Sequence, residues 1–396
     1  MNSNTYIISA RAVRDFGDGF VAILLPAYLI ALGYSATEVG VIATAALLGS
    51  SLLTIVIGAF NSRHDIRRLL LAAAGLMIAT GVAFAAIDEF AVLLVVAFAG
   101  TVNPSAGNVS IFVPLEHAAL AREVAAADRT KLFARYSLVG ALAAAVGSLA
   151  AAAPQYMVAT GIGEVTALKA MFVVYTALGV VGSLLYARIP KRPIQKSPDA
   201  PKAGLGPSRM IVYKLAALFS LDAFSGGFVV PSLLALWLFE RFDLSLATTG
   251  VLFFWTSVAT AFSFPVAAWI AKRIGLINTM VFTHIPSSLC LIAAAFAPTL
   301  PIVLALLLVR AFLAQMDVPT RSSYVMAVVT EAERPAAASF TSVPRGLASA
   351  GAPAITGAMF AASLYAWPLV IGGGLKISYD LILLLMFRNV KPPEEQ

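Results

Sequence analysis

Long apolar runs separated by short polar links dominate the chain. Each run is long enough to cross a lipid bilayer as a helix, which takes about 20 residues. The links contain short polar stretches such as "GYSA", "DEF" and "APT", which leave room only for antiparallel helical hairpins. The pattern predicts an all-α integral membrane protein with 12 transmembrane helices. The predicted spans cover residues 6–32, 37–60, 69–87, 91–117, 133–157, 166–188, 211–239, 245–270, 277–297, 300–327, 337–362 and 366–387.

Composition supports a membrane protein over a soluble one. Of 396 residues, 60% are hydrophobic and 12% are charged, whereas soluble domains contain about 45–50% apolar and about 25% charged residues. The first run carries acidic residues, and no small-residue cleavage site follows it before Glu38. We therefore expect a retained first helix rather than a signal peptide. The single cysteine, Cys290, allows no intramolecular disulfide.

The distribution of basic residues orients the predicted helices. With both termini placed in the cytoplasm, nineteen Lys and Arg residues fall at cytoplasmic links or helix ends, and only Lys169 and Arg241 fall on the opposite side. Positive residues concentrate on the cytoplasmic side of membrane proteins. The sequence thus predicts cytoplasmic termini. This asymmetric distribution of basic residues accounts for the net charge of +7, so the charge gives no reason to expect a nucleic-acid partner.

The two halves of the chain share features in the same order. The stretch "GYSATEVGVI" at 33–42 parallels "DLSLATTGVL" at 243–252. Parallel duplication of this kind is typical of secondary transporters built from two bundles. The longest polar link lies between the halves and is rich in Pro, Gly and Lys. We predict an N-terminal six-helix bundle at 1–188, a basic cytoplasmic linker at 189–210 and a C-terminal six-helix bundle at 211–396.

The link after the second span carries a family resemblance. "GAFNSRHDIRR", from Gly58 to Arg68, resembles the signature loop of the major facilitator superfamily of secondary transporters. Ser62 stands where that loop has an Asp, and Asp65 stands where it has its second Gly. The resemblance implies two pseudo-symmetric six-helix bundles that this loop helps to latch at the cytoplasmic side. The gating candidates are Arg63, Arg67 and Arg68 in this loop, Arg273 in its repeat, and Arg321 near the cytoplasmic end of span ten. The alternative is a basic loop that only sets topology.

Four charged residues lie in the first half of span one. Arg11 and Asp15 are spaced i,i+4, as are Arg14 and Asp18, so both pairs can form on one broad face of a helix. If the helix enters the membrane near Tyr6, Asp18 lies roughly 18 Å deep, close to the midplane. Such charges are costly in lipid and usually mark a polar path. The alternative is a structural ion-pair cluster at the cytoplasmic mouth.

Polar residues in spans four, seven and ten complete the candidate site. The resemblance implies that these spans and span one line a central cavity. In span ten, Arg310 lies near the midplane, and Asp317 can pair with Arg321 at i,i+4. In span four, Pro104 and Gly107 favour a kink. The candidate residues for binding substrate or proton are Arg14, Asp15, Asp18, Asn103, Asn108, Asp222, Arg310 and Asp317.

Other polar residues within the predicted spans receive structural interpretations. Lys376 and Asp380 are spaced i,i+4 in span twelve, which the resemblance places at the periphery, so we expect a mutually neutralising pair. His284 precedes Ile-Pro in span nine and is interpreted as structural. Asp222 has the alternative of a helix-to-helix hydrogen bond. Three scattered histidines and one cysteine predict no metal site.

The expected function is solute transport without a cofactor. No phosphate-binding G-x-x-x-x-G-K-[ST] motif occurs, so ATP is not expected to drive transport, and the proton gradient is the expected driving force. The sequence shows no nucleophile–base arrangement of the kind that enzymes use, so we do not expect an enzyme. We expect a monomeric, multi-pass protein of a bacterial-type inner membrane whose partners are a small-molecule solute, the proton and the lipid bilayer.

The charged residues are compatible with two directions of transport. A carboxylate in a partly desolvated cavity lets substrate and proton compete for one group, which favours proton-coupled efflux by antiport. The alternative is proton-coupled uptake of an anionic metabolite held by Arg310 and Arg14. A sensor or assembly factor on the same fold is disfavoured because no soluble sensory domain is present.

The charge asymmetry predicts opposite locations for two links. Single cysteines placed at Ser197 and Ala36, in a Cys290→Ala background, should react from opposite sides of the membrane. An impermeant thiol reagent applied to intact cells should label Ala36→Cys and spare Ser197→Cys. Labelling of Ser197→Cys in intact cells would overturn the predicted topology.

Overall fold

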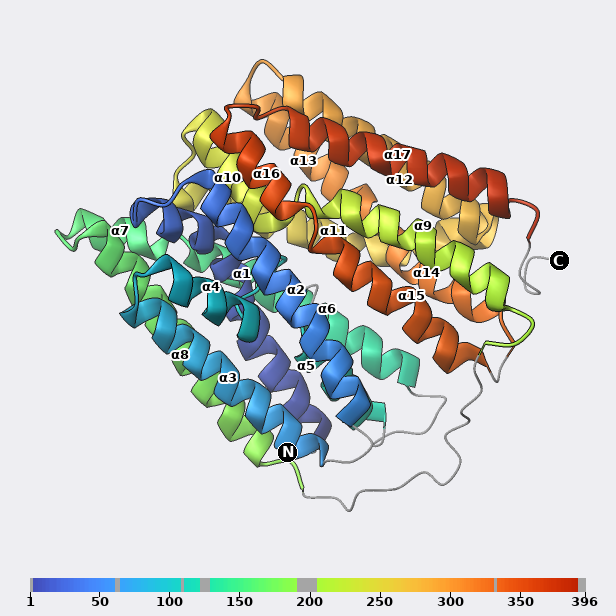
Figure 1. Ribbon diagram of the computed structural model, residues 1–396, viewed down its shortest axis with the longest axis horizontal. Helices are drawn as coiled ribbons and strands as arrows, with labels where there is room; N and C mark the ends of the chain where they lie inside the picture. Colours follow the sequence, from blue (N-terminus) through green and yellow to red (C-terminus); the bar gives the residue numbers. More distant parts are fainter. Residues whose placement is uncertain are drawn as a thin grey trace. The chain divides into compact units, whose positions relative to one another are not determined.

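The computed structural model describes residues 3–60, 65–107, 110–121, 129–190, 205–330 and 333–390, and within these ranges it is helical without a strand (Figure 1). The helices in the described residues are α1 (Ser3–Ala31), α2 (Ala36–Phe60), α3 (Ile66–Ala86), α4 (Phe90–Ala99), α5 (Phe112–Ala121), α6 (Arg129–Ala150), α7 (Ala153–Ala159), α8 (Glu164–Ala187), α9 (Arg209–Gly227), α10 (Pro231–Phe242), α11 (Leu246–Ile274), α12 (Leu276–Phe296), α13 (Leu300–Ala314), α14 (Asp317–Ala327), α15 (Arg334–Ser349), α16 (Pro353–Ala361) and α17 (Trp367–Phe387).

Seven predicted spans are single helices and five are interrupted. Spans one, two, three, six, eight, nine and twelve correspond to α1, α2, α3, α8, α11, α12 and α17. Spans four, five, seven, ten and eleven are each divided between two helices. Glycine and proline account for several breaks: α10 follows Gly227 and begins at Pro231, and α16 begins at Pro353. In span ten, Pro319 has no N–H to donate to the carbonyl of Gln315, where the helix stops.

The break in span four lies where the sequence predicted a kink. The chain leaves the helical conformation after Ala99 and resumes it at Phe112. Within this segment, Ala106 and Gly107 adopt positive φ angles of 51° and 85°. A helix cannot continue through two such residues, so the predicted kink is a full interruption.

Nine segments in the described part of the chain are long and apolar enough to cross a membrane. Helix α1 is also long, but its four charged residues set it apart from those nine. Helices α4 and α5 are ten residues each. The helical class of the predicted fold is confirmed, whereas the count of twelve spans and the cytoplasmic termini stay predictions.

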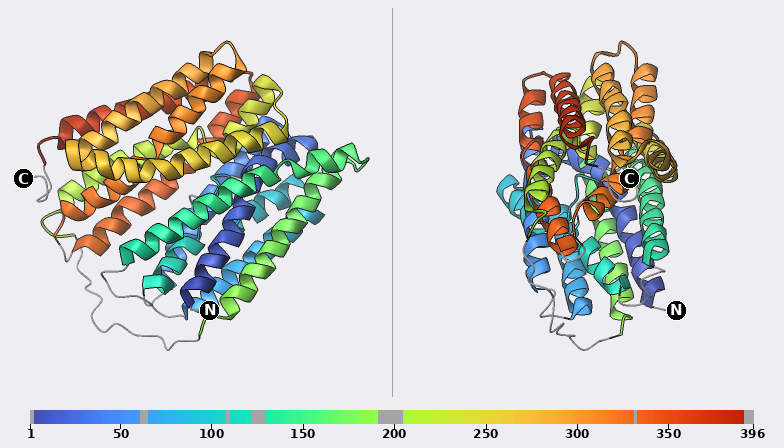
Figure 2. Two further views of the ribbon diagram at one scale, coloured as in Figure 1. Left: turned by 180° about the vertical axis from the view of Figure 1, so that it is seen from behind. Right: turned by 90° about the vertical axis from the view of Figure 1, so that its right-hand side faces the viewer.

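The chain divides into two compact units. Unit 1 contains Met1–Lys196 and Val230–Phe254, and unit 2 contains Ser197–Val229 and Trp255–Gln396. In unit 1, α1 packs against α6 and α8, α3 packs against α8, and α2 packs against α4 (Figures 1 and 2). In unit 2, α9 packs against α15 and α17, and α12 packs against α13, α14 and α17. Helix α10, although it follows α9 in span seven, packs with unit 1.

Two glycines let α1 and α6 approach closely. A Cβ atom at Gly147 would lie 2.0 Å from the Phe16 carbonyl oxygen, and one at Gly19 would lie 2.2 Å from the Ala144 carbonyl oxygen. Both distances are far below van der Waals contact, and the obstructing atoms are backbone. The positions of Arg11 and Asp15 on α1 therefore depend on small residues at this crossing.

Substitution at this crossing should separate the helices. We expect Gly147→Ala to destabilise the folded protein by about 1–3 kcal/mol, because an extra methyl group overpacks the contact. Thermal unfolding in detergent micelles measures the effect. Gly182→Ala in α8 is the matched control, since its Cβ would meet no atom within 4 Å. Equal stability of the two variants would show that the α1–α6 crossing is not tightly constrained.

Candidate functional site

Unit 1 contains a buried cluster of charged residues around α1. The cluster draws on α1 and on α5, the helix that resumes span four. We refer to Arg11, Arg14, Asp15, Asp18 and Glu116 as the N-terminal cluster. All but Arg11 are buried.

Glu116 joins four helices of unit 1. Arg14 Nη1 donates to Glu116 Oε2 at 2.9 Å. The hydroxyl groups of Tyr136 on α6 and Tyr186 on α8 donate to the same carboxylate at 2.5 and 2.6 Å. Glu116 is fully buried, so among the described residues these three donors take the place of water around its charge. The Arg14 guanidinium also lies over the Phe112 ring, 4.6 Å from its centroid.

Asp15 forms ion pairs with both arginines of the cluster. Its carboxylate lies 2.5 Å from Arg11 Nε and 3.1 Å from Arg14 Nη2. The predicted i,i+4 pair of Arg11 and Asp15 is thus present. The expected pair of Arg14 and Asp18 is not formed, because the Arg14 guanidinium is directed to Asp15 and Glu116 instead.

Asp18 stands apart from the other acids of the cluster. Its side chain is 2% exposed, and within the described residues it forms no ion pair. Its Oδ1 atom is buried without a hydrogen-bond partner there. A Cβ atom at Gly107 would lie 3.4 Å from Asp18 Oδ2, so the interrupted segment of span four passes beside this carboxyl group.

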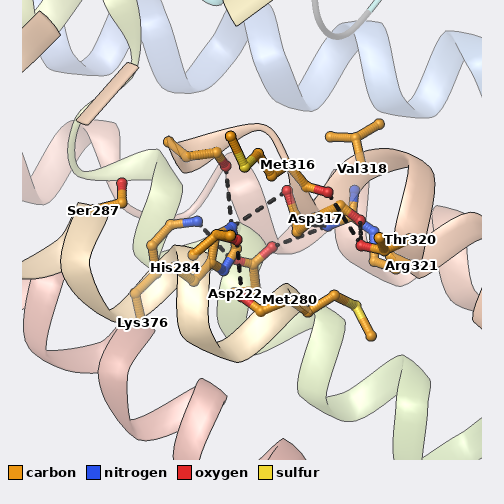
Figure 3. A network of polar contacts seen from close by, with 12 residues as sticks. Asp222, Met280, His284, Ser287, Met316, Asp317, Val318, Thr320, Arg321 and Lys376 are labelled. Carbon is orange, nitrogen blue, oxygen red and sulfur yellow. Dashed lines mark hydrogen bonds and ion pairs between the residues drawn. The ribbon is translucent and has the colours of Figure 1, made fainter. Parts of the chain in front are cut away.

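Unit 2 contains a second cluster of charged residues, most of them buried, whose members come from α9, α12, α14 and α17 (Figure 3). Figure 3 shows the side chains of Asp222, His284, Asp317, Arg321 and Lys376 directed toward one another. We refer to Asp222 on α9, His284 on α12, Asp317 and Arg321 on α14, and Lys376 and Asp380 on α17 as the C-terminal cluster.

Asp222 is surrounded by cations. Lys376 Nζ lies 2.7 Å from its Oδ1. Arg321 Nη1 lies 3.5 Å from Oδ2, and Arg345 Nη2 on α15 lies 3.7 Å from the same atom. Lys376 was expected to pair with Asp380 on its own helix, but its ammonium group reaches Asp222 on α9. The predicted Lys376–Asp380 pair is therefore replaced by a link between α17 and α9.

Asp317 lies between an arginine and a histidine. The predicted i,i+4 pair of Asp317 and Arg321 is present as a short ion pair. His284 Nε2 lies 3.3 Å from Asp317 Oδ1, and His284 Nδ1 lies 3.3 Å from Asp380 Oδ1. The imidazole thus connects the acids of α14 and α17.

Arg310 and Asn103 lie outside both clusters. Arg310 on α13 is half-buried and takes part in no ion pair between described residues, although it shares span ten with Asp317. The helix break after Ala314 separates the two. The Asn103 side chain accepts hydrogen bonds from the backbone and hydroxyl of Ser105, which shapes the turn in span four. Asn108 lies outside the described residues.

The gating candidates have different surroundings. Arg67 donates to the Ala187 carbonyl at 2.8 Å and so joins the start of α3 to the end of α8. Arg68 is exposed. Arg273 stacks over Trp269 at 4.0 Å and lines a cavity of about 360 Å³ together with Lys272 and Arg388. Arg63 lies outside the described residues, and Arg321 belongs to the C-terminal cluster.

Three residues that hold these clusters together were not among the binding candidates from the sequence. Glu116 was not singled out, His284 was interpreted as structural, and Lys376 was placed at the periphery. One signal was available for all three: each is an ionisable residue inside a predicted span. Their partners lie on helices distant in the sequence, which periodicity along a single helix cannot identify.

Comparison with known proteins identifies relatives over the whole chain. The sequence profile of the Major Facilitator Superfamily matches residues 7–222 and 215–396. An uncharacterized membrane protein of Saccharomyces cerevisiae, YJR124C, is 22% identical over 418 residues, which cover 96% of this chain and 92% of the yeast protein.

Solved transporter structures share the fold. The nucleoside transporter NupG superposes with a TM-score of 0.75 at 13% identity, covering 98% of this chain and 100% of that chain. The xylose transporter XylE from E. coli superposes with a TM-score of 0.76 at 14% identity, covering 99% and 98%. At such identities the likeness concerns the fold and says nothing of the solute.

Removing the Glu116 charge should destabilise unit 1. We expect Glu116→Gln to cost about 3 kcal/mol, because Arg14 then loses one of its two buried counter-charges. Thermal unfolding in detergent micelles measures the loss. Glu89→Gln is the control, since Glu89 is exposed and makes no capping hydrogen bond, and it should change stability by about 0.5 kcal/mol or less. A Glu116→Gln protein as stable as this control would exclude a structural role for the ion pair.

Proposed function

The chain belongs to the Major Facilitator Superfamily, and from this premise we propose that it is a proton-coupled secondary transporter of a small organic solute. The proposed cycle is alternating access, the proposed location is a cell inner membrane, and the protein itself acts as a monomer without a cofactor. Asp18 is the carboxyl group that carries the proton in this proposal.

This proposal rests on one observation: Asp18 forms no ion pair with any described residue. The N-terminal cluster contains three acids and two arginines, and both guanidinium groups are bound to Asp15 or Glu116. Asp18 lies one helical turn from Asp15, so a charge on both would be repulsive. Burial without a partner disfavours the charged form of a carboxyl group. A proton on Asp18 leaves the cluster with two positive and two negative charges.

Competition for Asp18 supports exchange over co-transport. A carboxyl group that is neutral with its proton can bind a cationic or hydrogen-bond-donating solute when the proton leaves. Each ligand then displaces the other, which is the requirement for antiport. With an inward proton gradient, antiport drives the solute out of the cell. We therefore favour efflux.

Asp222, the second coupling candidate, receives a structural role in this proposal. Its carboxylate lies within 4.0 Å of Lys376, Arg321 and Arg345. Three surrounding cations favour the ionised form of Asp222 and leave little reason for it to take up a proton. Its function is then to hold α9 against α14 and α17.

Uptake of an anionic metabolite is the second candidate, and Arg310 is the observation in its favour. Its guanidinium takes part in no ion pair between described residues and could hold a carboxylate or phosphate with two parallel hydrogen bonds. Arg14, the other arginine assigned to such an anion, is already bound to Glu116 and Asp15. The uptake proposal therefore depends on Arg310 alone.

Loss of the Asp18 carboxyl group should abolish coupling while leaving the fold intact. Proteoliposomes with an internal pH-sensitive dye are challenged with a panel of cationic, neutral and anionic solutes. For wild type we expect at least one external solute to alkalinise the lumen, because the solute enters as a proton leaves. Asp18→Asn, which keeps the size of the side chain, should eliminate the change.

Asp243→Asn is the matched control for this substitution. Asp243 is exposed and adopts a positive φ of 51°, which Asn also tolerates, so the control should couple as wild type does. A solute-induced pH change that survives in Asp18→Asn would remove Asp18 as the coupling group. Acidification of the lumen by an anionic solute would instead favour uptake by symport.

A further inference from the structure

His284 is held at the break in span ten by two acceptor atoms. Its side chain is 1% exposed. Nε2 lies 3.1 Å from the Ala314 carbonyl oxygen and 3.3 Å from Asp317 Oδ1. Ala314 is the last residue of α13, so its carbonyl has lost its helical donor. A carbonyl can only accept a hydrogen bond, and Asp317 is paired with Arg321 as a carboxylate. Nε2 must therefore carry a hydrogen.

The other ring nitrogen faces a carboxyl group. His284 Nδ1 lies 3.3 Å from Asp380 Oδ1. Asp380 is fully buried, and neither of its oxygens accepts a hydrogen bond from the described residues. If the ring were neutral with hydrogen on Nε2, the Nδ1 lone pair would face the lone pairs of an ionised carboxylate. That contact is repulsive, so the 3.3 Å approach favours one proton shared by Nδ1 and Asp380.

The cations around this pair are bound to other acids. Lys376, one turn before Asp380 on α17, is bound to Asp222 of α9. Arg321 of α14 is bound to Asp317 and also faces Asp222. The remaining groups on neighbouring positions are Arg345 of α15, which faces Asp222, and the Tyr379 ring, whose centroid lies 6.3 Å from that of His284. No cation except His284 contacts Asp380 among the described residues.

We propose that His284 and Asp380 form a second proton-binding site, in unit 2, which takes up and releases a proton independently of Asp18. The proton moves between water and the Nδ1–Asp380 gap. With it bound, the pair is either imidazolium with carboxylate or imidazole with carboxylic acid, and both forms are neutral overall. Without it, the pair carries one negative charge. A role of this site in transport rests on the proposed proton coupling. Binding of a proton by His284 and Asp380 does not depend on that proposal.

The site is tested by counting protons rather than by transport. Purified protein in detergent is shifted from about pH 5.5 to about pH 9, a range in which ordinary aspartates are already ionised, and an indicator dye reports the protons released. Asp380→Asn should release one proton fewer than wild type, because the Asn amide donates to Nδ1 without titrating. Asp18→Asn should also release one fewer, and the double variant two fewer.

The outcomes separate the two sites. Release by Asp380→Asn equal to that of wild type overturns the present inference. A normal release by Asp18→Asn alone counts against the proposed function and leaves the pair in unit 2 intact. Asp243→Asn, the exposed control, should match wild type in this pH range.

A second measurement covers the case in which a variant folds poorly. In otherwise wild-type protein carrying His64→Gln and His117→Gln, nitrogen NMR reports the ring of His284 alone. We expect hydrogen on Nε2 throughout the pH range and a change at Nδ1 as the pair loses its proton. A neutral ring with hydrogen on Nδ1 and none on Nε2 would contradict the assignment.

Discussion

The need to neutralise charge inside a helical bundle organises both units of this protein. An ionised side chain removed from water is tolerated when a partner of opposite charge and hydrogen-bond donors replace its hydration. In unit 1 this requirement draws α5, α6 and α8 onto Arg14 through Glu116. In unit 2 it draws α17 and α14 onto Asp222. The same rule singles out Asp18 and Asp380, the two acids of the clusters that contact no lysine or arginine among the described residues, and the proposed protons are placed at these acids.

Interrupted helices place backbone groups beside the charged clusters. A broken helix frees backbone groups that must find partners within the protein. In span ten, the freed Ala314 carbonyl meets His284, and the break brings Asp317 to the start of a new helix. In span four, the interruption brings backbone close to Asp18 without adding a charge there. Polar chemistry and backbone irregularity therefore occur at the same places, as both need an environment other than lipid.

The sequence predicted the helices better than it predicted their partners. Apolar periodicity located α1, α8 and α17 closely, because span length is set by the bilayer and is visible in any single run. The i,i+4 spacing also identified the pairs of Arg11 with Asp15 and of Asp317 with Arg321, whose side chains lie on one helix face. Arg14 and Lys376 bind Glu116 and Asp222, which lie on other helices. A long basic side chain can reach several acids, and the sequence does not indicate which of them it binds.

The central claim is that Asp18 carries a proton inside the folded protein, and infrared absorption tests it most directly. A protonated carboxyl group absorbs at a carbonyl frequency distinct from that of a carboxylate. In purified protein at neutral pH, the account predicts such an absorption in wild type and a clear loss of intensity in Asp18→Asn. An absorption of equal intensity in the two proteins, or none in wild type, would contradict the account.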